Sequence, residues 1–186
     1  MNHELSTMDC LLSMKNILVV LPNWFGETLF TTPFLRALRS QCPDASITTL
    51  GWPACREVLL HNPRVSALLD YEERGAHAGL GGKWRLLRAL RAQRFDTAFI
   101  LRPSLSRSLL LALAGIPVRV GFDQPKSGWL LTHRVPRPAR PTHKALSYLP
   151  ALNAVGLLAS ASPYEYTVTP EEREWARRFL TDTCRV

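Results

Sequence analysis

The chain has 186 residues, which is enough for one well-buried domain and too few for two full ones. Hydrophobic residues make up 46% of it and charged residues 20%, near ordinary globular values, which excludes wholesale disorder. Because 23 Lys and Arg face 15 Asp and Glu, the net charge of +8 favours an anionic partner: a phosphorylated ligand, a nucleic acid or an acidic membrane surface.

The four cysteines, Cys10, Cys42, Cys55 and Cys184, show neither the paired spacing of a zinc site nor the density of a disulfide scaffold. No apolar run approaches the ~18 residues of a membrane span, and the start of the chain lacks a basic n-region. The sequence therefore predicts a cytoplasmic protein with reduced thiols and no metal site. We expect residues 1–14 to form a flexible extension.

The most informative stretch begins at residue 17. Residues 17–21 are an unbroken apolar run, residues 22–26 a loop containing Pro and Gly, and Glu27 opens a segment of helical periodicity over 28–41. This order predicts a buried parallel strand, a tight loop and a helix, with Glu27 at the sheet edge where α/β proteins bind ligands. Glu27 is then either a chemical reagent or only a favourable charge at the helix start.

The remaining pattern alternates strands and helices, which predicts a Rossmann-like parallel sheet flanked by helices. Further strands are expected at 46–51, 67–70, 96–101 and 118–122. Further helices are expected at 53–60, 83–94, 106–114, 143–156 and 171–180. Residues 71–82 predict a mobile glycine-containing loop, and the long connection 123–142 predicts a functional flap.

The helix expected at 83–94 is basic and amphipathic. Its spacing places Trp84, Leu87 and Leu90 on one face and Arg85, Arg88 and Arg91 on another. Such a helix is a solvated outer helix or a binding surface. No glycine-rich phosphate loop occurs in the chain, which argues against a dinucleotide or nucleoside-triphosphate site.

Residues 17–27, Ile-Leu-Val-Val-Leu-Pro-Asn-Trp-Phe-Gly-Glu, followed by Pro-Phe-Leu-Arg-Ala-Leu at 33–38, resemble the opening of the lipopolysaccharide heptosyltransferase family, glycosyltransferase family 9. Segments similar to the family follow in the same order at 95–96, 114–122 and 143–157. The resemblance covers roughly residues 15 to 182, and the Pro-x-Trp-x-Gly loop is most similar to the heptosyltransferase II type.

The resemblance implies the two-domain glycosyltransferase B architecture, with acceptor sites in the N-terminal domain and the nucleotide-sugar site mostly in the C-terminal one. Residues 15–168 would be the acceptor-binding domain and residues 169–186 the start of the interdomain helix. The donor domain would be absent. We therefore expect a truncated chain that is inactive alone.

The implied reaction is an inverting, metal-independent transfer of heptose from ADP-heptose to the inner core of lipopolysaccharide, with no cofactor. Glu27 stands where the family usually has an aspartate that acts as the general base. Glutamate keeps the carboxylate but moves its oxygens by about an ångström, a displacement that can be costly in a preorganised site.

The implied acceptor is the anionic inner core on lipid A, which carries Kdo, and peripheral contact with the inner face of the inner membrane would follow. Candidate acceptor-binding residues are Asn23, Trp24, Gly26, Arg102, Ser104, Arg107, Lys126, Arg134, His143 and Lys144. Arginines can grip carboxylates or phosphates bidentately. Trp24 is either a sugar platform or a core plug, and a histidine at a helix start, such as His143, is usually a cap.

Two rival functions stay open. One is a non-enzymatic nucleic-acid-binding module that uses Arg85, Arg88, Arg91 and Arg94 as phosphate contacts. It lacks interleaved aromatic residues and leaves Glu27 unexplained. The other is a two-domain glycosyltransferase with a different donor.

Overall fold

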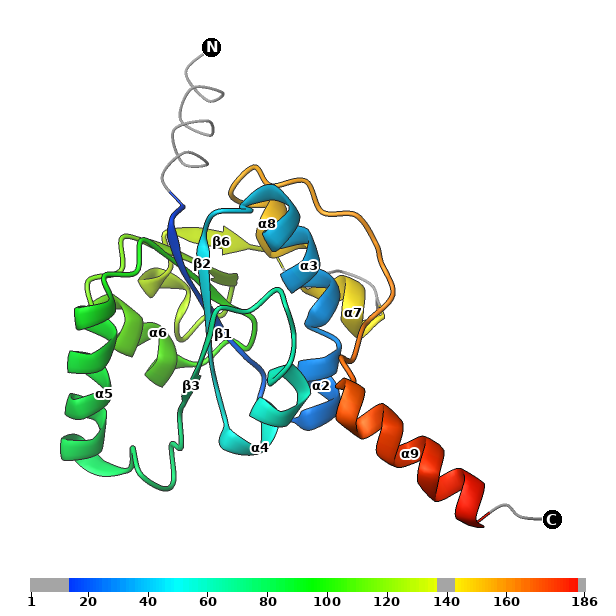
Figure 1. Cartoon of the computed structure of the whole chain (residues 1–186). Coiled ribbons are helices and arrows are strands. Elements are labelled where there is room, and N and C mark those ends of the chain that lie inside the picture. Colours follow the sequence, from blue (N-terminus) through cyan, green and yellow to red (C-terminus); the bar gives the residue numbers. More distant parts are fainter. Residues whose placement is uncertain (1–13, 137–142, 184–186) are drawn as a thin grey trace.

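A computed structural model describes residues 14–136 and 143–183. Its centre is a six-stranded sheet in the order β3-β2-β1-β4-β5-β6, with every neighbouring pair parallel (Figure 1). The strands are β1 (Asn16–Val20), β2 (Ser46–Gly51), β3 (Ala67–Asp70), β4 (Thr97–Ile100), β5 (Val118–Phe122) and β6 (His133–Val135). This is the doubly wound order of Rossmann folds, so the predicted fold class is confirmed.

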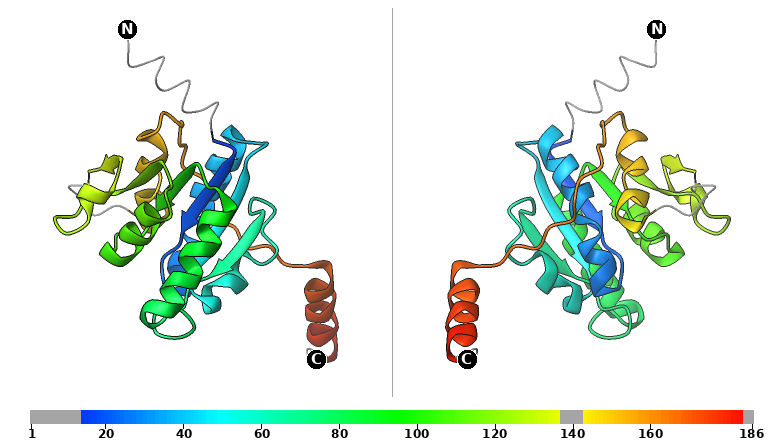
Figure 2. Two further views of the ribbon diagram at one scale, coloured as in Figure 1. Left: turned by 90° about the vertical axis from the view of Figure 1, so that its left-hand side faces the viewer. Right: turned by 90° about the vertical axis from the view of Figure 1, so that its right-hand side faces the viewer.

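Helices cover both faces of the sheet, which explains why β1 is apolar from Ile17 to Val20 (Figure 2). Val19 packs with Phe34 of α3 (Thr32–Gln41) and Leu152 of α8 (Pro150–Asn153) in one buried cluster. Leu18 packs in a second cluster with residues of α5 (Gly79–Gln93) and α6 (Leu105–Leu113). Alternate residues of β1 therefore serve opposite cores.

The helix predicted over 28–41 is two helices, α2 (Phe25–Leu29) and α3. Pro33 is the second residue of α3, because proline has no amide hydrogen and is tolerated only in a first turn. The break brings Glu27 into α2 rather than placing it before a long helix.

The helix predicted over 83–94 begins four residues earlier, at Gly79, so the expected loop is shorter. Gly82 fits closely against the preceding turn, where an added Cβ would lie 2.7 Å from the Ala76 carbonyl oxygen. The buried residues of α5 include Leu86, Leu87 and Leu90. Trp84, which the spacing places on one face with Leu87 and Leu90, lines a surface groove with Leu87 but is 56% exposed, so that face is buried only in part.

The expected flap contains ordered elements: a short 3-10 helix, η2 (Gly128–Leu130), and strand β6, which pairs with β5. β6 was missed because three residues between turns carry no periodicity. Residues 137–142 of the flap lie outside the described ranges, as do residues 1–13 of the predicted extension. Met14, the last residue of that extension, belongs to the core.

The helix predicted over 143–156 is likewise two short helices, α7 (Lys144–Ser147) and α8, because Pro150 starts a new helix. The short helix predicted over 53–60 is observed as α4 (Pro53–Arg56) and η1 (Glu57–Leu59). The last helix, α9 (Pro170–Thr183), projects from the body in Figure 1. Within the described ranges, none of the helices is both long and apolar enough to cross a membrane.

Candidate functional site

The candidate site lies at the carboxyl ends of β1 and β4, the two central strands. The loop after β1 runs through Leu21, Pro22 and Asn23 into α2, and the loop after β4 leads into α6. Strand pairing therefore places these two loops side by side at one edge of the sheet, where doubly wound proteins bind ligands.

Glu27 is half-buried at this edge and pairs with Lys144 of α7, with 3.0 Å between Oε1 and Nζ. Their side chains are 29% and 53% exposed, so a ligand can reach both. Sequence reasoning named both residues separately, and the structure brings them together. The pair places a carboxylate next to a cation that can meet an anionic ligand.

Tyr148, which sequence reasoning missed, belongs to the surroundings of Glu27. Burial raises the pKa of the Tyr148 phenol above its usual value; the negative charge of Glu27 adds to this rise, and Arg102 opposes it. Tyr148 is therefore a neutral phenol at any ordinary pH. Its spacing of four residues from Lys144 on a predicted helix was the signal that could have found it.

Arg107 is a buried cation behind the loop, only 4% exposed. It donates to the Leu21 carbonyl oxygen at 3.3 Å and to Oδ1 of Asn23, and its guanidinium lies 5.7 Å from the Tyr71 ring centroid. Among the described residues, no carboxylate lies within ion-pair distance of Arg107, and its Nε has no hydrogen-bond partner. Burial lowers the pKa of Arg107, and the charge of Glu73 is the main influence in the opposite direction.

These contacts show Arg107 orienting the loop. With its Oδ1 engaged by Arg107, Asn23 keeps its amide hydrogens for another partner. Arg107 itself is too buried to be an open binding group.

Trp24 and Gly26 are both exposed beside Glu27. Trp24 is 68% exposed, which excludes the core-plug alternative, and its carbonyl oxygen accepts from the Thr28 amide at 2.9 Å as α2 begins. An added Cβ at Gly26 would meet nothing within 4 Å, so packing within the described chain does not require glycine there. The ring and the open backbone leave room for a ligand above the loop.

The other named residues occupy different positions. Ser104 precedes α6 and contacts the Ser106 hydroxyl at 3.0 Å, and Arg102 is exposed after β4. His143 is the N-cap of α7, where its Nδ1 accepts from the Ala145 amide at 3.3 Å and its ring packs on Phe30.

The remaining two candidates lie toward the β6 edge of the sheet. Lys126 is exposed in the turn before η2. Arg134, on β6, lines a separate groove with Pro150 and Asn153. The structure does not bring Arg134 to Glu27, so its ligand role rests on the sequence alone.

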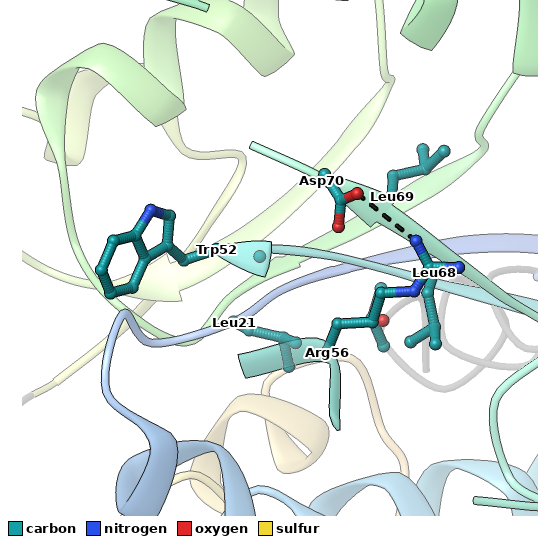
Figure 3. Close-up of a pocket in the computed structure, with 8 residues that line it drawn as sticks. Leu21, Trp52, Arg56, Leu68, Leu69 and Asp70 are labelled. Carbon is teal, nitrogen blue, oxygen red and sulfur yellow. Dashed lines mark hydrogen bonds and ion pairs between the residues drawn. The ribbon is translucent and has the colours of Figure 1, made fainter. Parts of the chain in front are cut away.

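A pocket beside Leu21 and Gly51, shown in Figure 3, is too small for a sugar. Its volume is about 10 Å³, close to the space of one water molecule. Arg56 and Asp70 form an ion pair at its rim, with 3.4 Å between Nη1 and Oδ2. This pocket is a feature of packing and not a substrate site.

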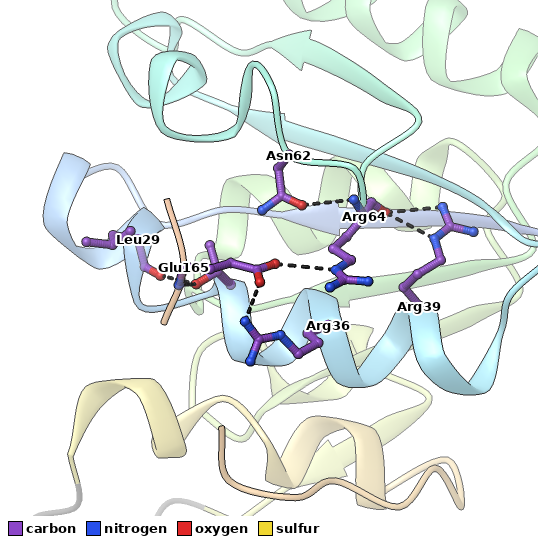
Figure 4. Close-up of polar contacts among 7 residues, drawn as sticks. Leu29, Arg36, Arg39, Asn62, Arg64 and Glu165 are labelled. Carbon is purple, nitrogen blue, oxygen red and sulfur yellow. Dashed lines mark hydrogen bonds and ion pairs between the residues drawn. The ribbon is translucent and has the colours of Figure 1, made fainter. Parts of the chain in front are cut away.

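A second polar cluster is centred on Glu165 and joins distant segments of the chain (Figure 4). Glu165 pairs with Arg36 of α3 and with Arg64, and its amide donates to the Thr32 hydroxyl at 2.9 Å. Burial acts to raise the pKa of Glu165, but the hydrogen bonds and charges of Arg36 and Arg64 outweigh it and hold the pKa below its usual value. The cluster fastens the segment before α9 to α3.

Across the described ranges, no three His, Cys, Asp or Glu side chains gather closely enough to hold a metal ion. The candidate site is thus a carboxylate, its lysine partner, an exposed indole and a buried arginine that holds their loop. Such a set can take a proton from a bound hydroxyl group and attract anionic groups around it.

Comparison with known proteins shows the family of the chain. The sequence model of glycosyltransferase family 9 (heptosyltransferase) matches residues 83–182, more than half of the chain. The chain belongs to this family. Lipopolysaccharide heptosyltransferase 2 of Escherichia coli K12 is 30% identical over 106 residues, and lipooligosaccharide heptosyltransferase 2 of Haemophilus influenzae is 28% identical over 107 residues.

Solved structures of the family share the fold. A family 9 glycosyltransferase of Veillonella parvula superposes with a TM-score of 0.82 at 24% identity, covering 93% of this chain and 51% of that one. The ADP-heptose lipopolysaccharide heptosyltransferase II of Escherichia coli superposes with a TM-score of 0.67 at 24% identity, covering 88% of this chain and 50% of that one.

The matches cover only part of each relative. The chain spans about half the length of these structures, and the matched stretch is 30% of the Escherichia coli heptosyltransferase 2 sequence and 57% of this chain. The domain boundary expected near residue 169 stays a prediction.

Proposed function

We propose that this chain is the acceptor-binding half of a heptosyltransferase, which transfers heptose from ADP-heptose to the inner core of lipopolysaccharide. The observation that carries the proposal is the half-buried Glu27 carboxylate at the carboxyl edge of the sheet in a family 9 chain. The relatives named for lipopolysaccharide heptosyltransfer support the same donor and acceptor classes.

In the proposed reaction Glu27 is the general base. As the acceptor hydroxyl oxygen forms its bond to the anomeric carbon of the heptose, Glu27 takes the hydroxyl proton. The bond from that carbon to the diphosphate oxygen breaks, and ADP leaves with the electron pair. Attack opposite the leaving group inverts the anomeric centre, and a base so positioned contributes roughly 10²–10⁴-fold to the rate.

Lys144 has two roles in this proposal. Its ammonium group, 3.0 Å from the Glu27 carboxylate, forms an ion pair that holds this carboxylate in position. It is also exposed enough to meet a carboxylate or phosphate of the acceptor, together with Arg102 nearby. Trp24 supplies an exposed ring on which a sugar can stack, and Asn23 keeps its amide hydrogens for a sugar hydroxyl.

The other candidate residues extend this proposal. Ser104, Arg107, Lys126, Arg134 and His143 stay candidate contributors to acceptor binding, with Arg107 acting through the loop that it orients. No cofactor is needed, because ADP-heptose enters as a substrate. We propose that the protein works in the cytoplasm at the inner face of the inner membrane, where a lipid-anchored acceptor is accessible.

The first test is a calorimetric titration of the chain with a soluble inner-core saccharide bearing Kdo, with ADP as a comparison ligand. We expect the saccharide to bind and Lys144→Gln to weaken that binding, because one cation at the site is lost. Absence of saccharide binding, with tight and salt-sensitive binding of nucleic acid instead, would overturn the proposal in favour of the rival module.

The second test concerns transfer itself, measured with ADP-heptose and lipid-linked acceptor after the chain is joined to the donor-binding half of a family relative. Glu27→Gln should lower kcat roughly 10²–10⁴-fold while saccharide binding persists. The matched control is Glu57→Gln, an exposed carboxylate on η1, which should leave kcat unchanged. Equal kcat values for Glu27→Gln and the unsubstituted protein would exclude Glu27 as the base.

A further inference from the structure

An apolar groove of about 780 Å³ runs between α5 and α6 on the outside of the molecule. From α5, Leu80, Trp84 and Leu87 line it at helical spacing of four and three residues. From α6, Leu109 and Leu113 line it four residues apart. Figure 2 shows α5 as an outer helix in its left-hand view.

The groove exposes several large apolar side chains next to one another, which is rare on a protein surface that faces water. Leu80 is 89% exposed, Trp84 56%, Leu113 51% and Leu109 42%. Singly exposed apolar residues need no explanation, but a contiguous set around a groove marks an interaction site.

The margin of the groove is strongly basic. Exposed Lys83 and Arg91 line the groove, and Arg85, Arg88 and Arg94 are exposed elsewhere on α5 and at its end. Neither α5 nor α6 contains an Asp or Glu, and none of these five cations forms an ion pair with another described residue. Arg91 is used within the fold, since its Nη2 donates to the Leu113 carbonyl oxygen at 2.8 Å.

A second exposed apolar pair, Trp175 stacked on Phe179 of α9, provides the contrast. Its helix carries acids as well as bases, and Glu174 pairs with both Arg177 and Arg178. The α9 helix therefore lacks the excess of cations that α5 carries, although Glu73 accepts from the Ser106 hydroxyl at the near end of the α5–α6 groove.

We propose that the α5–α6 groove docks on the surface of an anionic lipid bilayer. The exposed leucines and Trp84 enter the boundary between headgroups and acyl chains, and the surrounding cations meet anionic headgroups. This combination of apolar stripe and lysine and arginine rim is typical of helices that lie in a membrane interface.

The groove also joins the candidate site, and the inference in this respect rests on the proposed function. Tyr71 and Ser106, at the carboxyl edge of the sheet, line its near end. Tyr71 is also the ring beside Arg107, which holds the loop of Glu27. A bilayer seated on the groove would hold a lipid-anchored acceptor at the same edge as the base.

The test is sedimentation of the whole chain with vesicles of phosphatidylcholine alone and with vesicles containing phosphatidylglycerol in about equal amount. We expect uptake by the anionic vesicles only, weakening as salt is raised. The triple variant Lys83→Gln/Arg85→Gln/Arg88→Gln should reduce the partition coefficient roughly fivefold per cation, or roughly a hundredfold in all.

A matched control removes the same number of charges elsewhere. Arg173→Gln/Arg177→Gln/Arg178→Gln on α9 has the same net charge as the first triple variant and should keep most of the uptake. A second variant, Trp84→Ser/Leu109→Ser, leaves the charge unchanged and should lose uptake at least tenfold, because two apolar side chains are removed. Circular dichroism of each variant checks that it is folded.

Three outcomes would overturn the proposal: no uptake by anionic vesicles, an equal loss in both triple variants, or full uptake by Trp84→Ser/Leu109→Ser. A dimer that Leu109→Glu dissociates would assign the groove to a second copy of the chain. Tighter binding of a DNA oligonucleotide through Lys83, Arg85 and Arg88 would assign it to nucleic acid. Vesicle uptake requires neither ADP-heptose nor heptosyl transfer. The result can therefore be interpreted even if the heptosyltransferase proposal fails.

Discussion

The two faces of the sheet differ in how completely the helices that cover them bury their apolar side chains. On the face covered by α3, α7 and α8, buried side chains such as Phe34 and Phe99 fill the space, and the Glu165 cluster ties the crossing segment to α3. On the face covered by α5 and α6, the inner rows of leucines are buried while Leu80, Trp84 and Leu109 stay uncovered.

This difference separates the residues that stabilise the fold from the residues that are available to bind a partner. Both helices of the second face pack on the sheet through buried residues, including Leu90 and Leu111, and their outer apolar rows are exposed. An apolar row that the fold does not use is available to a partner. A groove beside α8, lined by Arg134, Pro150 and Asn153 among others, is smaller, at about 440 Å³.

The largest expected effect tests this difference directly. Phe99→Ala should destabilise the protein by about 3–5 kcal/mol, because the ring is fully buried and packs edge-on against Phe34 at 5.3 Å between centroids. Trp84→Ala should change the free energy of unfolding by no more than about 0.5 kcal/mol, since its ring is largely exposed. Urea denaturation of both variants measures the two values.

A large loss of stability in Trp84→Ala would contradict the comparison. It would show that the groove residues support the fold and are not a spare surface. Leu111→Ala is the control for the second face, because Leu111 is fully buried and should cost about 2–5 kcal/mol.

A smaller effect on the free energy of unfolding is expected from the Glu165 cluster on the first face. Glu165→Gln should lower the free energy of unfolding by about 1 kcal/mol at neutral pH, because the ion pairs with Arg36 and Arg64 lose their charge. The pKa of Glu165 is lower when folded than when unfolded, so this stabilisation is present above the unfolded value of about 4.3 and is lost as pH falls through the folded value.

Urea denaturation at several pH values checks this prediction. The difference between the unsubstituted protein and Glu165→Gln should shrink as the solution is acidified below the unfolded pKa. Glu174→Gln on α9 is the matched control: its ion pairs with Arg177 and Arg178 are more exposed, so the change should be about 0.5 kcal/mol or less. A pH-independent difference for Glu165→Gln would show that the ion pairs contribute nothing.

Much of the fold followed from local pattern. The apolar run at 17–21 could be predicted because a parallel strand buried on both faces is short and apolar. The strands at 46–51, 67–70 and 118–122 could be predicted from short runs rich in apolar and β-branched residues. β6 could not be predicted, since its three residues are ordered by pairing with β5. The exposure of Trp84 was also beyond the sequence, because periodicity gives the angle between residues but not which stripe faces the core.

The features of the candidate site also fall into two groups: those that local sequence predicts and those that depend on contacts between distant residues. Glu27 could be found because its position depends only on one strand and one loop. Its pairing with Lys144 joins residues far apart in sequence, so no local pattern contains it. The burial of Arg107 behind Asn23 depends on how α6 packs on the sheet, and an arginine near a strand end reads from sequence as a surface group.

The smallest predicted effect lies at the end of α5, on the face that carries the groove. Arg94 closes this helix in the left-handed region, with φ of 53° and ψ of 48°, where a side chain costs about 1–2 kcal/mol. Arg94→Gly removes that strain but adds freedom to the unfolded chain, so we expect a net gain of roughly 0.5 kcal/mol in the free energy of unfolding.

The matched control is Gln93→Gly, one residue earlier at a regular helical position, which should lose about 1 kcal/mol. If urea denaturation shows that Arg94→Gly raises the free energy of unfolding and Gln93→Gly lowers it, the backbone at Arg94 is strained. Because an arginine is a poor choice for that position on stability alone, a stabilising Arg94→Gly that also weakens uptake by anionic vesicles would mean that the cation is kept for binding. A destabilising Arg94→Gly would instead assign Arg94 to holding α5 in place.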